Sequence, residues 1–358
     1  MAMQYLRLAL IIGLVAVFSL GLALGLSLMI PGLGRPEPGY ERIPEGVMFV
    51  HGDTSVPLGG LTRYEATGLV EDLAPSFTVL PQDAYLDRAT RGVVPGLEGR
   101  GLDVAAVIEK ALASERGGLV GPSYCPVPAA VTLSDFPEAP VYRGNPGKKA
   151  VAVILNVAWG DEYLDGLLTI AEKAGARLTV CPAGTWLDGD EERATWLAAA
   201  SSRGHEIGNH GYYNRPMTYN AEQITREIER TSDLIEAACG SRPVIFAPPM
   251  GEFNQGTLTA AAALGCRTVI WSLDTVDWRR EGVDVISRRV TSRVGPGDII
   301  LCHPTEQTGP AMEQFLRVIR EKGLAVVTVS ELLSPEVLAE EDGPPGGNAP
   351  EGADSAGG

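Results

Sequence analysis

The sequence is short of basic residues, and this shortage argues against one broad class of partner. Its 358 residues hold 29 lysines and arginines against 45 aspartates and glutamates, a formal net charge of −16. A protein that binds nucleic acid non-specifically needs a basic residue for each phosphate that it neutralises. We therefore expect no nucleic-acid partner. Charged residues make up only 21% of the chain and hydrophobic residues 45%, so the chain as a whole is not intrinsically disordered.

The chain also lacks closely spaced cysteine pairs. Its five cysteines are scattered with no Cys-x-x-Cys spacing, which argues against a zinc knuckle and against a dense disulfide framework. The odd number leaves at least one thiol free. The five are Cys125, Cys181, Cys239, Cys266 and Cys302.

Residues 8–30 contain no charged side chain. As a helix, this segment would span roughly 35 Å, enough to cross the hydrocarbon core of a bilayer. It is either a transmembrane anchor or a signal peptide, and its length favours a retained anchor. Arg7 before the segment weakly places the N-terminus inside. We expect a single-pass protein of the cell membrane, joined to it by this N-terminal helix, with most of the chain extracytoplasmic.

Changes of composition divide the rest of the chain. A linker rich in proline and glycine leads to a predicted small N-terminal α+β domain over residues 45–140, with a strand at 47–50 and a helix at 104–112. A turn-rich boundary at 143–149 precedes a larger domain over residues 148–334. Residues 336–358 are rich in glycine, proline and acidic residues, which predicts a disordered acidic tail.

The larger domain alternates strand-like and helical segments. One helix is predicted over residues 220–238, where Asn220 and Gln223 resemble a capping box. Seven β-then-α units favour a parallel sheet that closes, or nearly closes, into a barrel. We therefore predict an α/β fold, a distorted (β/α)7 barrel, with function at the carboxyl ends of its strands. The predicted strands cover residues 150–155, 178–181, 205–208, 244–246, 268–273, 298–302 and 325–329.

Polar side chains follow five of these strands. A single histidine at a strand end is more often structural than catalytic, but several polar strand ends that meet at one barrel mouth favour acid–base or metal-assisted chemistry. The polar stretches are residues 156–162, 208–214, 247–251, 274–278 and 301–303.

These stretches, in this order, resemble the five motifs of the carbohydrate esterase family 4 polysaccharide deacetylases, which carry the NodB homology domain. The first motif, Thr-Phe-Asp-Asp-Gly in the family, is replaced by Asn-Val-Ala-Trp-Gly at 156–160. The second keeps His210 but has Asn214 for its second histidine. The third, Arg-x-Pro-x-Gly, reads Ala-Pro-Pro-Met-Gly at 247–251. The fourth is present as Asp274, Asp277 and Trp278, and the fifth as Leu301 and His303.

The resemblance implies roles for the matching residues. In the family, two carboxylates and two histidines provide a general base and a divalent metal site, and a last histidine protonates the leaving amine. What we call the acid half is kept: His303 as general acid, Asp277 as the carboxylate that tunes it, Leu301 beside the acetyl methyl group and Trp278 on the groove wall. Asp274 is a further catalytic candidate, and Pro249 and Gly251 are candidates for substrate binding.

What we call the base half is lost. Ala158 replaces the general base, Trp159 the metal carboxylate, Asn214 a metal histidine and Ala247 the arginine that orients the base. Neither alanine nor tryptophan can bind a metal, and a hydrolytic zinc site normally has three protein ligands.

The resemblance implies a divalent metal such as zinc, and these substitutions predict that it binds weakly or not at all, through His210 and Asn214. Asp161 could serve as a substitute ligand, or Glu162 next to it. Alternatively, both belong to the first turn of the next helix, where acidic residues are favourable.

The degenerate first motif is similar to that of a sporulation-associated subgroup of membrane-anchored proteins, in which a small domain precedes the NodB domain. Residues 93–103 also resemble modules that bind peptidoglycan, so the small domain is a candidate wall-binding domain.

Three functions stay open. The first is metal-assisted deacetylation of an extracellular polysaccharide such as peptidoglycan or spore cortex, a hydrolysis of carbon–nitrogen bonds with His303 as general acid. The second is a catalytically inactive membrane protein that binds glycan, and the third a scaffold without glycan affinity. A nucleophilic pair of Cys302 and His303 is not expected, because neighbouring residues on a strand face opposite sides.

Overall fold

The structure, a computed structural model, describes residues 40–337. The predicted anchor at 8–30 and the tail from residue 338 onward lie outside the described residues. None of the helices between residues 40 and 337 is long and apolar enough to cross a membrane. Within this range the chain forms two units, a small one of residues 40–77 and 101–125 and a larger one of residues 78–100 and 126–337.

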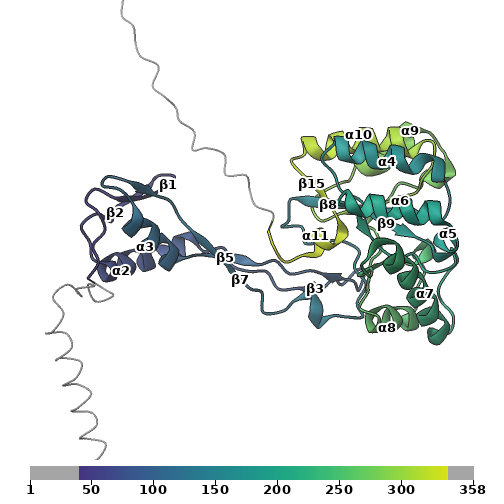
Figure 1. The fold of residues 1–358 in the computed structure, drawn as a ribbon, viewed down its shortest axis with the longest axis horizontal. Coiled ribbons are helices and arrows are strands. Elements are labelled where there is room, and N and C mark those ends of the chain that lie inside the picture. Colours follow the sequence, from purple (N-terminus) through teal and green to yellow (C-terminus); the bar gives the residue numbers. More distant parts are fainter. Residues whose placement is uncertain (1–39, 338–358) are drawn as a thin grey trace, which may run out of the picture. The chain divides into compact units, whose positions relative to one another are not determined.

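The small unit has the predicted α+β character. Its central strand β1 pairs antiparallel with β2 and parallel with β6, and its two helices pack against this sheet around Phe49, Val70 and Ile108 (Figure 1). The predicted strand at 47–50 and helix at 104–112 are present. The elements are β1 (Met48–His51), β2 (Thr54–Pro57), α2 (Arg63–Leu73), η1 (Ala74–Phe77), α3 (Val104–Ala113) and β6 (Leu119–Val120).

The small unit is shorter than the predicted domain at 45–140 and is discontinuous. Residues 78–100 and 126–140 belong to the larger unit, because their backbone and apolar side chains find partners there. Glu98 N–H donates to Pro335 O at 2.8 Å, and Val93 packs in a core cluster with residues of the barrel strands. The elements of these segments are β3 (Tyr85–Leu86), β4 (Val93–Val94) and η2 (Leu133–Asp135). The strands β5 (Gly99–Leu102) and β7 (Tyr124–Val127) pair with each other, and each contains residues assigned to both units.

The larger unit contains the predicted parallel strands. Six of them form one sheet in the order β10, β9, β8, β14, β13, with β15 also paired to β8. A parallel bridge from Asn209 to Phe246 leads from the end of β10 to the pair β11 and β12. The predicted strand at 268–273 is interrupted and forms two short strands, β12 and β13. The strands are β8 (Ala150–Val157), β9 (Thr179–Pro182), β10 (Glu206–Ile207), β11 (Ile245–Phe246), β12 (Arg267–Thr268), β13 (Leu273–Asp274), β14 (Ile299–Cys302) and β15 (Ala325–Val327).

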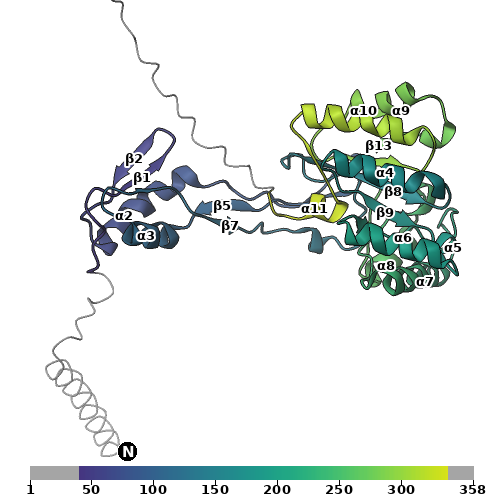
Figure 2. The same cartoon turned by 45° about the horizontal axis from the view of Figure 1, so that its top comes forward.

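Helices follow the strands, as expected of a (β/α) barrel. Figures 1 and 2 show α4, α9 and α10 together on one side of the sheet and α6, α7 and α8 together on another. The predicted helix at 220–238 is α7, and Asn220 caps it by accepting a hydrogen bond from Glu222 N–H at 2.9 Å. The helices are α4 (Asp161–Lys173), α5 (Gly184–Leu187), α6 (Glu191–Ser202), α7 (Ala221–Cys239), η3 (Pro249–Gly251), α8 (Gln255–Ala263), η4 (Asp277–Arg279), α9 (Val283–Thr291), α10 (Thr308–Glu321) and α11 (Val329–Leu333).

The alternation along β8 decides which residues reach the barrel interior. Val151, Val153 and Leu155 pack in the cluster beneath the helices, whereas Ala152 and Ile154 pack in the other cluster, among residues of the neighbouring strands. With a period of two, Asn156 follows Ile154 on the inner side, at the carboxyl end of the strand.

Candidate active site

A cavity of about 530 Å³ lies at the carboxyl ends of the parallel strands. All five polar stretches picked out in the sequence contribute to its lining, so the fold brings them together. Function in such folds collects at this end of the sheet, because the loops that follow parallel strands meet there. The lining residues are Asn156, Ala158, Trp159, His210, Asn214, Met250, Trp271, Asp274, Trp278, Leu301 and His303.

The acid half is an ordered hydrogen-bond network. The fully buried carboxylate of Asp277 accepts from the Nδ1–H of His303 at 2.8 Å and from the backbone N–H of His303 at 2.7 Å. It also accepts from the hydroxyl of Thr308 at 2.9 Å. Since a carboxylate only accepts, Nδ1 carries the hydrogen, and Nε2 is the ring nitrogen left for a bound molecule.

The other predicted residues of the acid half surround this pair. Leu301, two residues before His303 on β14, and the half-exposed indole of Trp278 both line the cavity. Asp274 lines it too, and its Oδ1 accepts from Val276 N–H at 2.8 Å in a local turn. Asp274 therefore has a structural contact of its own besides its place in the wall.

The base half presents an aromatic surface where the family has carboxylates. Ala158 contributes only a methyl group to the wall, and Trp159 turns its indole toward His303. The two rings stack with an interplanar angle of 8° and centroids 6.1 Å apart. The indole thus lies parallel to the ring of the general-acid candidate, on the same wall of the cavity.

His210 and Asn214 also reach the cavity. The buried imidazole of His210 donates from Nδ1 to Ala247 O at 2.7 Å, and its ring is also hydrogen-bonded to the side chain of Asn214. Burial lowers its pKa to about 4, with a further lowering from His303 nearby. His210 is therefore neutral at physiological pH, in the tautomer that a metal ligand needs.

The structure corrects the prediction that Asp161 could serve as a metal ligand. Asp161 is the first residue of α4, and its two oxygens accept from Trp186 Nε1 at 2.6 Å and Arg193 Nε at 2.8 Å. It does not belong to the cavity lining, and neither does Glu162. The alternative interpretation, an acidic first turn of a helix, describes both residues.

The residues present do not fit a divalent metal. Within residues 40–337, no three histidine, cysteine, aspartate or glutamate side chains lie together so that they could hold a metal ion. In the base half, His210 is joined only by Asn214, a weak neutral ligand, and by the indole of Trp159. Hydrolytic zinc sites normally have three protein ligands, so this donor set does not support the family's metal chemistry.

The third motif builds a wall rather than a polar site. Pro249 and Gly251, the two predicted substrate-binding residues, do not line the cavity, and Pro249 is buried in η3. Met250, which lies between them, lines the cavity. Gly251 has a φ of +69°, and a Cβ there would lie 2.9 Å from the ring of Trp271. A glycine at this position therefore lets Trp271 reach the cavity.

Cys302 faces away from the cavity. It packs with Phe315 and Met312 in the cluster beneath the helices, whereas its neighbour Leu301 packs among the strands. Burial raises the pKa of its thiol well above the usual value. Cys302 is a small apolar side chain of the core, and the structure has no Cys302–His303 pair.

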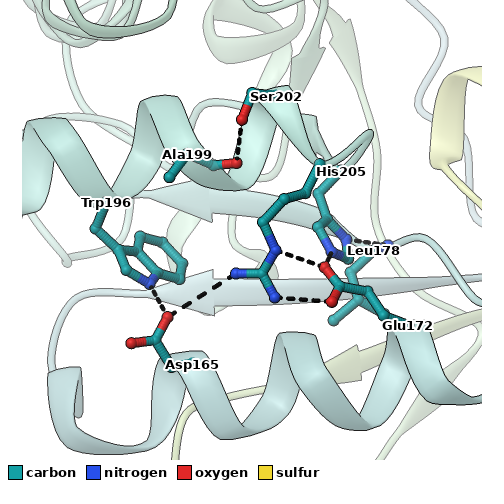
Figure 3. Close-up of polar contacts among 8 residues, drawn as sticks. Asp165, Glu172, Leu178, Trp196, Ala199, Ser202 and His205 are labelled. Carbon is teal, nitrogen blue, oxygen red and sulfur yellow. Dashed lines mark hydrogen bonds and ion pairs between the residues drawn. The ribbon is translucent and has the colours of Figure 1, made fainter.

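His205, a third histidine near a strand end, has a structural role. Figure 3 shows its ring between the Leu178 backbone and Glu172: Nδ1 accepts from Leu178 N–H at 3.0 Å, and Nε2 lies 3.1 Å from Glu172. Arg203 holds the same carboxylate through two hydrogen bonds and lowers its pKa to about 2. Burial lowers the pKa of His205.

The sequence motifs assign no role to three lining residues, Asn156, Met250 and Trp271. Asn156 could have been found, since the alternation of β8 places it on the inner side, directly at the first motif. Trp271 could not, because the predicted strand at 268–273 is interrupted there and the strand pattern says nothing of where its side chain points.

This is a parallel α/β fold of the (β/α) type, in which the strands do not close into a complete barrel between residues 40 and 337, and its five motif stretches surround one cavity at the strand ends. The profile of the polysaccharide deacetylase family matches residues 143–269. The uncharacterized protein YlxY of Bacillus subtilis is 34% identical over 261 residues, 73% of this chain and 81% of the relative. The chain therefore belongs to the polysaccharide deacetylase (CE4) family. Its narrower placement in a sporulation-associated subgroup stays a prediction.

Solved structures agree with the fold. A CE4 family pseudoenzyme from Bacillus anthracis is 31% identical, with a TM-score of 0.65 over 76% of this chain and 96% of that chain. A mutant of that protein, described as having restored enzymatic activity, aligns with the same TM-score at 29% identity, over 76% of this chain and 99% of that chain.

A further sequence relative has a stated activity. A peptidoglycan-N-acetylglucosamine deacetylase of Bacillus cereus is 29% identical over 138 residues, 37% of this chain and 50% of the relative.

Proposed function

We propose that this protein binds an N-acetylated polysaccharide of the peptidoglycan type in its cavity and does not carry out metal-assisted hydrolysis. The observation that carries the proposal is the pair Ala158 and Trp159, which stand where the family has its base and metal carboxylates. Peptidoglycan deacetylases and a CE4 pseudoenzyme among the relatives support both parts of it.

The cavity suits a sugar. Its volume of about 530 Å³ lies in the ordinary range of small-ligand sites, roughly 300–1,000 Å³. Three of the five tryptophans of the chain, Trp159, Trp271 and Trp278, line it. Indole faces pack against the C–H faces of pyranose rings and bury large apolar areas.

The acid half has a binding role in this proposal. With Nδ1 fixed by Asp277, the Nε2 of His303 can hydrogen-bond a hydroxyl or amide group of a bound sugar. The same arrangement would protonate a leaving amine in an active deacetylase. The intact network is thus the one observation that favours the second candidate function, residual deacetylation with His303 as general acid.

The site of action is part of the proposal. If residues 8–30 form the expected anchor, the cavity is presented to the cell wall from the outer face of the cell membrane. The small unit would add a second contact with the wall.

The experiment uses the full-length protein purified in detergent. Binding to N-acetylglucosamine tetramer and to peptidoglycan sacculi is measured beside acetate release with added zinc or cobalt, with an active family member as positive control. We expect binding without acetate release. Acetate release at a rate near that of the active enzyme would overturn the proposal in favour of deacetylation, and absence of binding to both glycans would leave the scaffold function.

A further inference from the structure

Asn156 is a buried asparagine whose side-chain oxygen has no hydrogen-bond partner. Its side chain lines the cavity, the residue is 3% exposed, and its Oδ1 makes no hydrogen bond. The other such atoms among residues 40–337 belong to Ser123, Tyr219 and Glu227, which do not line the cavity. A buried amide left unpaired costs about 1–3 kcal/mol, so native structures rarely keep one without a bound molecule to pair with it.

Two other buried asparagines show the usual arrangement. Asn145 donates to Pro95 O at 2.9 Å and accepts from Gly147 N–H at 2.8 Å. Asn209 donates to Ile228 O and Ser232 Oγ and accepts from Gly211 N–H at 2.7 Å. Both hold loops in place. The amide of Asn156 holds no segment of the described chain, so its position serves the cavity rather than the fold.

The position of Asn156 is next to the acid half. In the ladder of β8 and β14 the last paired residues are Leu155 and Cys302, and Asn156 and His303 are the next residue of each strand. The amide and the imidazole therefore stand at neighbouring strand ends of the same cavity. With Ala158 and Trp159 in place of carboxylates, the polar groups at this end of β8 reduce to that one amide.

We propose that Asn156 is the residue that selects an N-acetylated sugar, through a hydrogen bond between its side-chain amide and the acetamido group. This inference rests on the proposed function. A primary amide both donates and accepts, and so does an acetamido group, so the two are complementary in either orientation of the Asn156 side chain. The ammonium group of a free amino sugar offers only donors, so it can pair with Oδ1 of Asn156 but leaves the side-chain N–H without an acceptor.

The test compares two ligands and three forms of the full-length protein. Titration calorimetry measures the affinities for the N-acetylglucosamine tetramer and the glucosamine tetramer in wild type, Asn156→Ala and Asn156→Leu. We expect wild type to prefer the N-acetylated tetramer, and each variant to lose about tenfold in affinity for it. The affinity for the glucosamine tetramer should fall less, because that ligand pairs with only one of the two groups of the amide, so selectivity falls.

Thermal unfolding separates recognition from a structural role, with Asn209→Leu as the matched control. Leucine resembles asparagine in size, so Asn156→Leu should leave the melting temperature unchanged or raise it, whereas Asn209→Leu should lower it. Unchanged selectivity in both Asn156 variants, as a water bound to the amide would give, overturns the inference while leaving the proposed function standing. Failure of wild type to bind either tetramer overturns the inference, and the proposed function falls with it if peptidoglycan sacculi are not bound either.

Discussion

The acid half of the cavity retains the residues of the family, whereas the base half does not. In the acid half, Asp277 satisfies three donors and fixes the ring of His303, while Leu301 and Trp278 stand where the family has them. In the base half, methyl, indole and amide groups occupy the positions of the base and the metal ligands. Because a metal site needs several ligands at once, the loss of the metal carboxylate and of one histidine leaves His210 as the one metal ligand kept from the family, whereas the hydrogen-bond network of the other half does not depend on the metal.

The difference shows which half the fold itself requires. Asp277 joins the start of η4 to the end of β14 and the start of α10, so it stabilises the barrel whatever the activity. The carboxylates of the base half would serve only the metal and the reaction. They can be replaced without harm to the fold, and Ala158 and Trp159 occupy their places.

The largest effect is expected where the base half is rebuilt. The triple variant Ala158→Asp, Trp159→Asp, Asn214→His provides the missing carboxylates and histidine beside His210, whose Nδ1 is already held by Ala247 O. We expect bound zinc to rise from near zero to about one equivalent, measured by elemental analysis after dialysis. Adding His210→Ala to the triple variant should bring it back to near zero. A folded triple variant without zinc would show that the base half has lost more than its ligands.

The acid half can be tested by its contribution to stability. Asp277→Ala leaves the donors of His303 and Thr308 without their acceptor, at about 1–3 kcal/mol for each buried group. We expect the free energy of unfolding in urea to fall by about 3 kcal/mol or more. Asp274→Ala, the matched control, removes one local bond and should cost about 1 kcal/mol. Equal losses would mean that the Asp277 network is not a structural element.

A smaller effect, on glycan affinity, is expected when the indole of Trp159 beside His303 is removed. Trp159→Ala removes a stacking face, and we expect a threefold to tenfold loss of affinity for the N-acetylglucosamine tetramer, about 0.5–1.5 kcal/mol. Trp159→Phe should restore part of it. Trp196→Ala, which removes an indole on α6 bound to Asp165, should leave the affinity unchanged. If Trp159→Ala binds as tightly as wild type, the aromatic surface of the base half has no part in binding.

The smallest effect is expected in the pH dependence of the free energy of unfolding, to which the structural histidine His205 contributes. The pKa of His205 is lowered in the folded protein, so the unfolded chain takes up a proton first as the pH falls below about 6.5. Its contribution to stability is present above that pH and is lost as the pH falls toward the folded pKa. Glu172, with a pKa lowered from 4.5 to about 2, makes a contribution to stability that is fully present above pH 4.5 and is lost only as the pH falls below it.

Urea unfolding at pH 7.5 and pH 5 measures this contribution. We expect wild type to lose stability at the lower pH and His205→Gln to lose less. The remaining loss would come from His210, whose pKa is also lowered. An equal loss in both proteins would contradict the burial argument for His205.

Much of the fold was predictable because the barrel strands are short apolar runs with polar ends. The pattern placed β8, β9 and β14 within two residues and α7 within one, because Asn220 is a true cap. The break between β12 and β13 was not predictable, because residues 268–273 have the composition of one continuous strand. In the structure, Val269 forms an isolated bridge with Val141 at the point where the strand is interrupted.

The site was predictable where a residue's role follows from its place in a motif. The convergence of the strand ends and the pairing of His303 with Asp277 are of this kind. The place of Asp161 depended on tertiary partners, since only the folded chain brings Trp186 and Arg193 to its carboxylate. The unpaired side-chain oxygen of Asn156 was not predictable either, because a sequence pattern does not show which polar groups lack a hydrogen-bond partner in the fold.

The discontinuous course of the chain bears on its synthesis. Residues 78–100 leave the ribosome well before the strands and α11 against which Ala84 and Val93 pack. At about 5–20 residues per second, that interval is on the order of tens of seconds. During it, residues 40–77 and 101–125 are complete and can fold. The apolar side chains of the segment between them stay exposed to solvent until their packing partners are synthesised. A factor that holds nascent chains would therefore act on residues 78–100.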